Sequence, residues 1–251
     1  MICSGSLSVE PGLAETFEIT QGFAANNMPS QRKLAAYVAP MALFVVLLAF
    51  ASGLKKIDHR FWFASSEYWI YPLQTIFCGG LLIWFRREYD FGRLRNILFV
   101  SLVGAVVFVV WISPQQFLAF AARRDGFNPD VVADHPLLYW ATIFLRFLRL
   151  IVVVPLVEEI FWRGFLLRFF INENFERVRF GTFSWVSFIV VSLLFGFSHS
   201  ANDWTAGVVT GAVYNGVAYR TKSLWSCVLT HAITNLLLGL WIMKTKQWGF
   251  W

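Results

Sequence analysis

Charged residues are scarce in this chain of 251 residues: Asp, Glu, Lys and Arg together make up only 14% of it. An ordinary soluble domain carries about 25% charged residues. Aromatic residues reach 18% of the chain, and the mean hydropathy is +0.58. A soluble domain of this length would be less apolar, so we predict an integral membrane protein with several spans.

Cysteine is also scarce, and the three cysteines, Cys3, Cys78 and Cys227, are isolated from one another without a CxxC pair. This spacing excludes a thiolate zinc site and a disulfide framework. The HExxH motif of zinc peptidases is absent as well, and we find neither an internal repeat nor a second domain.

Residues 1–31 lack both the basic start and the apolar centre of a signal peptide. They contain three glutamates, Glu10, Glu15 and Glu18, among small polar residues. We therefore expect a polar, poorly ordered N-terminal tail, with the first span acting as the insertion signal.

Apolar stretches recur along the rest of the chain. Several approach the ~20 residues that a helix needs to cross the ~30 Å hydrocarbon core, and a bundle that thins the bilayer accommodates the shorter ones. They cover residues 34–54, 68–85, 97–113, 137–157, 183–197, 204–219 and 224–243. We predict an all-α fold, a polytopic transmembrane helix bundle of about seven spans (six to eight), with N-terminal helices over 32–136 and a catalytic core over 137–251.

Around 137–171 the apolar residues continue past Pro155 as far as Phe170. This length exceeds one ordinary span, which leaves two structures open. One is a kinked span, and the other is a span followed by a helix at the membrane interface.

The net charge of +6 could indicate nucleic-acid binding, but the Lys and Arg residues lie mostly in the connections between the apolar stretches. Such placement is typical of membrane flanks, so we expect the lipid bilayer as a partner and no nucleic acid. If the spans alternate in direction, eleven basic residues fall on the N-terminal side and seven on the other. This asymmetry predicts a cytoplasmic N-terminal side for a multi-pass protein of the cell membrane, in a bacterium the inner membrane.

Glu158, Glu159 and Arg163 lie within one of the apolar stretches. Helical spacing puts Glu159 and Arg163 one turn apart, while Glu158 points about 100° away. Glu159 can therefore pair with Arg163, and Glu158 remains free to accept a proton as a general base. The alternative is an ion-pair cluster that also includes Arg146 and Arg149.

Two histidines and an asparagine lie in later apolar stretches. His199, taken alone, could be an interfacial or core histidine, and His231 and Asn235, one turn apart, could form a helix–helix hydrogen bond. Unpaired polar groups in lipid cost several kcal/mol, so the groups on these three segments should face one another. We predict one buried catalytic site that contains Glu158, Glu159, Arg163, His199, His231 and Asn235.

The residue types suit hydrolysis of a carbonyl compound. A carboxylate and a histidine that share one water molecule would deprotonate it for attack. An imidazole and a carboxamide on the other side could donate to the oxyanion, a contribution of about 3–4 kcal/mol per donor. Neither a serine or cysteine nucleophile nor a cofactor is then required.

Gly207 and Gly211 form a small-xxx-small pattern, with Asn215 one turn further on. Small residues at this spacing permit close helix approach. We expect this approach to bring the region of His199 toward the other site residues.

The three motifs are EExxxR at Glu158, Glu159 and Arg163, FxxxH at Phe195 and His199, and HxxxN at His231 and Asn235. In this order they resemble the signature of the CAAX prenyl endopeptidase type II family, also called CAAX protease and bacteriocin-processing (CPBP) enzymes. The resemblance covers roughly residues 137–243. The layout is also similar to the bacterial CAAX protease-related subgroup found with exosortase and PEP-CTERM export systems.

The resemblance implies an all-helical intramembrane peptidase of the glutamic type, acting on a membrane-associated protein or peptide. Glu158 and His199 would activate water, His231 and Asn235 would form the oxyanion site, and the other glutamate and the arginine would support the structure. Zinc stays open as a cofactor, with Glu158, His199 and His231 as candidate ligands.

Two other functions could use the same residues. In a membrane haem protein, His199 and His231 would be the axial ligands, which leaves the glutamates without a role; a Soret band would identify it. A transporter or proton relay could use the buried carboxylates, and it predicts ion-dependent flux in liposomes.

Overall fold

The computed structural model describes residues 29–57, 60–123 and 126–251. The predicted polar tail falls almost wholly in residues 1–28, which lie outside the described residues. The described part of the chain is helical and contains no strand, which confirms the all-α prediction.

Seven helices correspond to the seven predicted spans. Their bounds are α2 (Gln31–Ile57), α4 (Glu67–Trp84), α5 (Ile97–Phe117), a long composite helix (Pro136–Phe169), α9 (Trp185–Phe197), α10 (Trp204–Thr221) and α11 (Leu224–Thr245). By length and composition, four of them can cross a membrane, namely α2, α5, the composite helix and α11. Short elements fill the connections: α3 (Phe61–Ala64) and the 3₁₀ turns η1 (Pro129–Val132), η4 (Phe175–Arg177), η5 (Ala201–Asp203) and η6 (Trp248–Phe250).

The composite helix is continuous over 34 residues, so the two structures that the sequence left open reduce to one long span without a separate interfacial helix. It consists of α6 (Pro136–Leu148), the π segment η2 (Arg149–Val153), α7 (Val154–Glu159), the π segment η3 (Ile160–Leu166) and α8 (Leu167–Phe169). Its length of about 50 Å exceeds the ~30 Å core, which requires tilt or ends that project from the hydrocarbon.

Pro155 explains the first π segment. The backbone N–H of Val154 bonds to the carbonyl of Arg149, five residues earlier. Proline has no N–H, so the next bond of this pattern, from Pro155 to the Leu150 carbonyl, cannot form. The side chain of Asn235 on α11 donates to that carbonyl instead, at 2.8 Å, which shows how a neighbouring helix satisfies backbone freed by proline in a membrane span.

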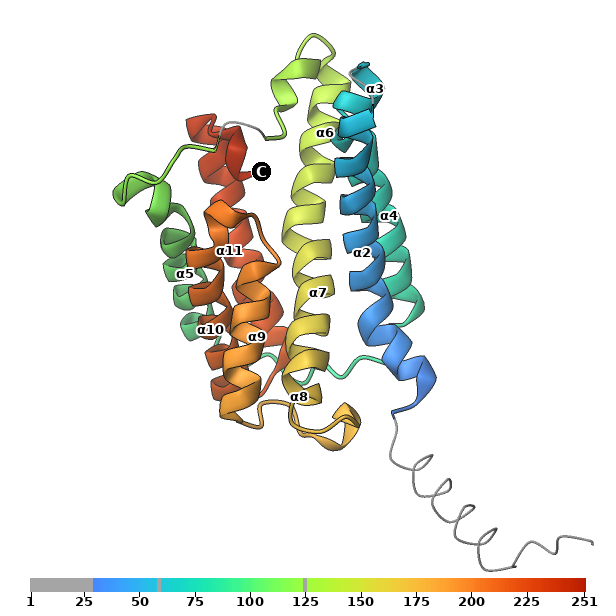
Figure 1. The fold of residues 1–251 in the computed structure, drawn as a ribbon, viewed down its shortest axis with the longest axis vertical. Helices are drawn as coiled ribbons and strands as arrows, with labels where there is room; N and C mark the ends of the chain where they lie inside the picture. The colour runs from blue at the N-terminus through green and yellow to red at the C-terminus, as the bar shows by residue number, and fades with distance from the viewer. Residues whose placement is uncertain (1–28, 58–59, 124–125) are drawn as a thin grey trace, which may run out of the picture.

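The composite helix separates two groups of helices: α2 and α4 pack on one side of it, and α5, α9, α10 and α11 on the other (Figure 1). At the end of the bundle where α2 begins, Arg32 pairs with Glu88 at 2.8 Å and Phe91 stacks on Trp225. We call this the basic end.

The opposite end holds residues 118–123 and 126–135 and the residues after α11. There Lys246 pairs with Asp130 at 3.2 Å and Gln116 donates to Gln247 at 2.8 Å. The consecutive helices therefore alternate in direction, which is the arrangement assumed when the basic residues on the two sides were counted.

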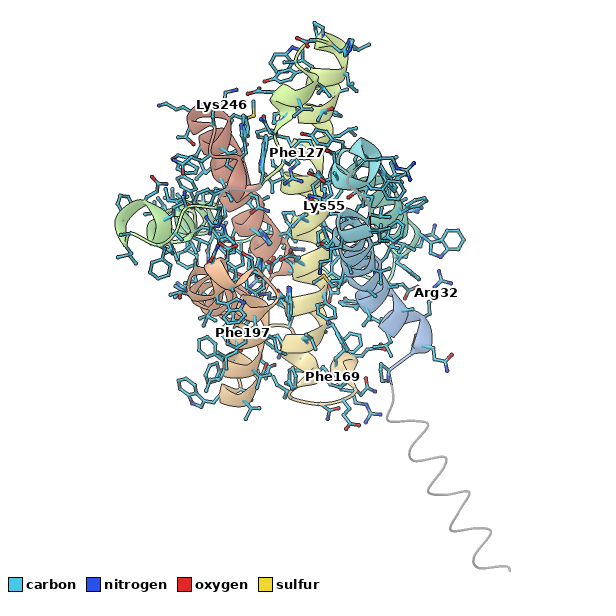
Figure 2. All side chains as sticks on the ribbon, turned by 45° about the horizontal axis from the view of Figure 1, so that its top comes forward. Arg32, Lys55, Phe127, Phe169, Phe197 and Lys246 are labelled. Atoms are coloured by element: carbon cyan, nitrogen blue, oxygen red, sulfur yellow. The ribbon has the colours of Figure 1, made fainter. Side chains whose placement is uncertain are left out.

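The bundle exposes apolar side chains and buries polar ones. Leu98, Leu137 and Trp185 are 75%, 87% and 68% exposed, whereas Glu159 and Arg163 are fully buried. Figure 2 shows side chains covering the outside of the helices, with the exposed Phe197 of α9 labelled among them. A surface of this kind suits contact with hydrocarbon, in agreement with a membrane protein.

Helix α9 is short, and its length determines the depth of the site. Its 13 residues extend about 20 Å, less than the hydrocarbon core. The turn between α9 and α10 therefore lies well short of the α6 end of the composite helix (Figure 1). His199 lies in this turn and is half-buried.

Candidate active site

The three motif segments meet around a cavity of about 150 Å³ between the composite helix, α9, α10 and α11. Four predicted site residues line it: Glu158, His199, His231 and Asn235. Other lining residues are Trp111, Leu150, Val154, Phe195, Thr210, Tyr214, Thr234, Leu238 and Phe250. The structure thus brings together the groups that the sequence places on three separate helices.

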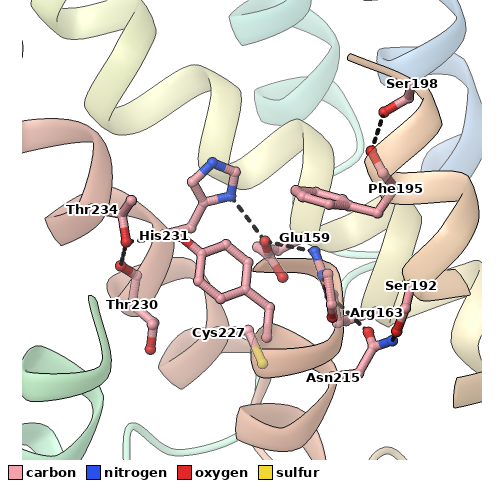
Figure 3. Close-up of polar contacts among 12 residues, drawn as sticks. Glu159, Arg163, Ser192, Phe195, Ser198, Asn215, Cys227, Thr230, His231 and Thr234 are labelled. Carbon is pink, nitrogen blue, oxygen red and sulfur yellow. Dashed lines mark hydrogen bonds and ion pairs between the residues drawn. The ribbon is translucent and has the colours of Figure 1, made fainter. Parts of the chain in front are cut away.

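Glu159 lies behind this cavity and joins two of its neighbours. Its Oε1 atom lies 3.0 Å from Arg163 Nη1 and 2.9 Å from His231 Nδ1 (Figure 3). The ion pair between Glu159 and Arg163 that helical spacing predicted is therefore present. The contact with His231 was not predicted, and it makes Glu159 the link between the EExxxR and HxxxN motifs.

Arg163 is held by three helices. Its Nε donates to Asn215 Oδ1 at 3.1 Å and its Nη2 donates to the Gly211 carbonyl at 3.2 Å, both on α10. Asn215 in turn donates to Ser192 Oγ on α9 at 3.1 Å. The guanidinium also lies 4.7 Å from the centre of the Phe195 ring. A buried charge with this many partners is stabilised in place, so the network fixes α9 and α10 against the composite helix.

Glu158 faces the cavity. It is 9% exposed, and its Oε2 atom has no hydrogen-bond partner among the described residues. Among the described residues Glu158 has no ion pair with Arg146 or Arg149; Arg149 Nε donates to Gln74 at 2.6 Å, and Arg146 lies over the Tyr71 ring. Glu158 therefore has an oxygen atom available for water or substrate.

The hydrogen bond of His199 determines which of its nitrogen atoms faces outward. Nδ1 lies 2.8 Å from the Phe195 carbonyl, an acceptor, so Nδ1 carries the hydrogen. The Trp111 ring packs edge-on against the imidazole, 5.1 Å between centres. Nε2 is then the nitrogen atom free to accept a proton.

His231 and Asn235 each have one polar atom engaged outside the cavity. The carboxylate of Glu159 accepts from His231 Nδ1, so the imidazole can donate through Nε2 only when it is protonated. Asn235 uses one N–H of its amide for the Leu150 carbonyl. A second N–H remains, because a primary amide has two.

Close packing of α9 on α10 depends on glycine. A Cβ on Gly207 would lie 2.9 Å from Gly196 Cα, and one on Gly211 would lie 2.9 Å from the Ser192 carbonyl oxygen. These contacts confirm the small-xxx-small prediction. They also explain how the short α9 is held where His199 reaches the cavity.

A second cavity of about 460 Å³ adjoins the first on its opposite-end side. The two share Trp111, His199 and Phe250. Arg123 and Asp203 form an ion pair on its wall. Burial lowers the pKa of Arg123 to about 10, which still leaves the guanidinium charged at neutral pH. This cavity offers polar partners through Arg123, Ser200 and Asn202.

The candidate zinc ligands share the cavity but are not gathered as a metal site. Within the described ranges, no three His, Cys, Asp or Glu side chains are placed so that they could hold a metal ion together. As arranged, this donor set does not fit zinc.

Several lining residues escaped the sequence analysis. Tyr214 donates to Thr234 at 2.8 Å beside the His231 ring, and Trp111 and Phe250 come from elements outside the three motifs. Asn215, which does not line the cavity, had a signal in the sequence as an amide inside an apolar helix, and it accepts from Arg163.

Comparison with known proteins gave two matches. Residues 140–237 match the family described as type II CAAX prenyl endopeptidase Rce1-like, which confirms the resemblance inferred from the three motifs. UPF0177 protein YaiH of Lactococcus lactis subsp. lactis (strain IL1403) is 24% identical over 169 residues. That alignment covers 63% of this chain and 65% of the relative's length. No solved structure matches the chain.

Proposed function

Since residues 140–237 match the type II CAAX prenyl endopeptidase family, we propose that this chain is an intramembrane endopeptidase that cleaves a membrane-associated protein or peptide. The observation that carries the proposal is the free Oε2 atom of buried Glu158 in a cavity shared with two histidines. A buried carboxylate with a free oxygen atom beside an imidazole suits the activation of water.

In the proposed reaction, Glu158 accepts a proton from water as the water oxygen attacks the scissile carbonyl. Nε2 of His199, the nitrogen left free by the Phe195 hydrogen bond, orients the same water molecule. The tetrahedral intermediate then collapses, the C–N bond breaks, and Glu158 returns the proton to the departing amine.

His231 and Asn235 would stabilise the oxyanion. The Glu159 carboxylate, 2.9 Å from Nδ1, holds the imidazole of His231 in place, and Nε2 would donate to the oxyanion when the imidazole is protonated. The second N–H of Asn235 supplies another donor. Both donors are preorganised by hydrogen bonds on their other side, which is how such sites stabilise a developing charge.

Two features favour this reading over the alternatives. Glu158, Glu159 and Arg163 each have a role in the proposed hydrolysis, whereas a haem held by His199 and His231 would leave them without one. The geometry of the donors does not fit zinc, so we propose a mechanism without metal ions. A prenylated substrate is not required by any of these contacts.

Comparative proteomics tests the function. Membrane and secreted fractions of cells with wild-type protein would be compared with those of cells carrying Glu158→Ala. We expect a protein fragment whose new terminus appears only with the wild type, which would identify both the activity and the substrate. Identical termini in both strains, at equal protein levels, would refute the proposed proteolysis.

Asn235→Ala should lower kcat by about 10²–10³-fold with little change in KM, if Asn235 donates to the oxyanion as such residues do elsewhere. Stability should fall too, because the Leu150 carbonyl loses its partner. Turnover per folded molecule separates the two effects. If the folded fraction of the variant turns over at the wild-type rate, Asn235 has no catalytic role and serves only as a helix–helix hydrogen bond. In the double variant with His231→Ala, the fall in kcat should be smaller than the product of the two single falls, since both residues act on one charge.

We also propose that the basic end faces the cytoplasm, which places the second cavity toward the other side of the membrane. In a variant with all three cysteines replaced by serine, Glu173→Cys would mark the basic end and Val131→Cys the opposite end. An impermeant maleimide should label Val131→Cys in intact cells and Glu173→Cys only after permeabilisation. The reverse pattern would invert the orientation.

A further inference from the structure

Thr210 on α10 has a buried hydroxyl group without a hydrogen-bond partner. The residue is 2% exposed, and Oγ1 has no partner among the described residues. Leaving a buried polar group unsatisfied destabilises a folded protein. Such an atom in a folded protein therefore indicates a water molecule or ligand that completes the site.

The other buried helical threonines behave differently. Each donates to the carbonyl four residues earlier, a common bond for threonine in helices. The pairs are Thr75 to Tyr71 at 2.8 Å, Thr221 to Val217 at 2.8 Å, Thr230 to Ser226 at 2.8 Å and Thr234 to Thr230 at 3.1 Å. Thr210 shares its helix with Thr221, so position rather than residue type accounts for the difference.

Thr210 lines the 150 Å³ cavity together with Glu158 and His199. Of the described side chains around this cavity, only Glu158 and Thr210 have a buried polar atom without a partner, Oε2 and Oγ1. A water molecule needs about 10–15 Å³ and two to four polar partners. The cavity offers the space and, with His199 Nε2, the partners.

We infer that Thr210 is a positioning residue that holds the attacking water against Glu158. The Thr210 hydroxyl donates to one lone pair of the water oxygen, while the water donates its two hydrogens to Glu158 Oε2 and His199 Nε2, so that the second lone pair is directed at the scissile carbonyl. Glu158 takes the first proton during attack and later passes it to the amine, so Thr210 exchanges no proton. This inference rests on the proposed proteolytic function.

The test compares Thr210→Val, which keeps the shape but removes the hydroxyl, with Thr210→Ser, which keeps the hydroxyl. Thr221→Val is the matched control on the same helix, because it removes a hydroxyl that bonds only to backbone carbonyls. The substrate fragment identified by proteomics would be used with the purified full-length chain. For each variant kcat, KM and the thermal midpoint would be measured.

For Thr210→Val we expect kcat to fall about tenfold with KM unchanged, the loss of one hydrogen bond in the transition state. Its thermal midpoint should stay the same or rise, since no protein contact is lost. Thr210→Ser should retain most activity, and Thr221→Val should lower the midpoint without changing turnover per folded molecule.

An active wild type with an equally active Thr210→Val would overturn the role of Thr210 alone. A loss of kcat accompanied by a lowered midpoint, without rescue by Thr210→Ser, would show a packing role instead. A wild type that cleaves nothing would defeat the proposed function, and the inference about Thr210 would fall with it.

Discussion

Glu158→Gln should abolish proteolysis while the protein still inserts and folds. The carboxamide matches the carboxylate in volume but cannot take the proton from water, and general-base removal costs about 10²–10⁴-fold in kcat. Oε2 of Glu158 has no protein partner to lose, so the free energy of unfolding should change little. Turnover of the purified variant and its thermal midpoint would be measured together.

The matched control is Glu173→Gln, the same change at an exposed glutamate in the connection at the basic end. It should match the wild type in both measurements. Full turnover by well-folded Glu158→Gln would remove the general base from the mechanism, and the free nitrogen of His199 would then be the remaining candidate.

Much of the helix bundle could be predicted from the sequence, because membrane spans depend on a simple property. Each helix must satisfy its own backbone hydrogen bonds in hydrocarbon, so apolar length nearly determines position. The starts and ends of α5 and α11 lie within a few residues of their predicted stretches. The continuity of the composite helix was harder to predict, because a proline in the sequence suggests a break in the helix. The π segment and the hydrogen bond from Asn235 keep the helix continuous across Pro155.

The gathering of the site residues could also be predicted, since isolated polar groups are unstable in lipid and must meet. The hydrogen-bond partners of these residues could not be predicted from the sequence. Spacing along one helix places Arg163 beside Glu159, but it cannot show that His231 bonds to the same oxygen atom. Cross-helix contacts of this kind depend on the rotation and tilt of each helix, which side-chain packing sets. Thr210 gave no signal in sequence because threonine is common in membrane helices and usually bonds to its own backbone.

Glu159→Ala and Arg163→Ala should each destabilise the protein by about 3–5 kcal/mol, since each change leaves a fully buried charge without its partner. The double replacement by leucine should cost much less than the sum of the single changes, because no uncompensated charge remains. Free energies of unfolding in detergent would measure these differences.

An exposed ion pair on the same protein provides the control. Arg32 and Glu88 lie 2.8 Å apart with 66% and 23% of their side chains exposed, and pairs of this kind contribute only about 0–1 kcal/mol. Glu88→Ala should therefore change stability by less than Glu159→Ala. If Glu159→Ala proves as stable as Glu88→Ala but inactive, Glu159 acts through His231 and not as a structural support. In that case Glu159→Gln should restore part of the activity, because its amide oxygen can still accept from His231 Nδ1 and hold the imidazole in place.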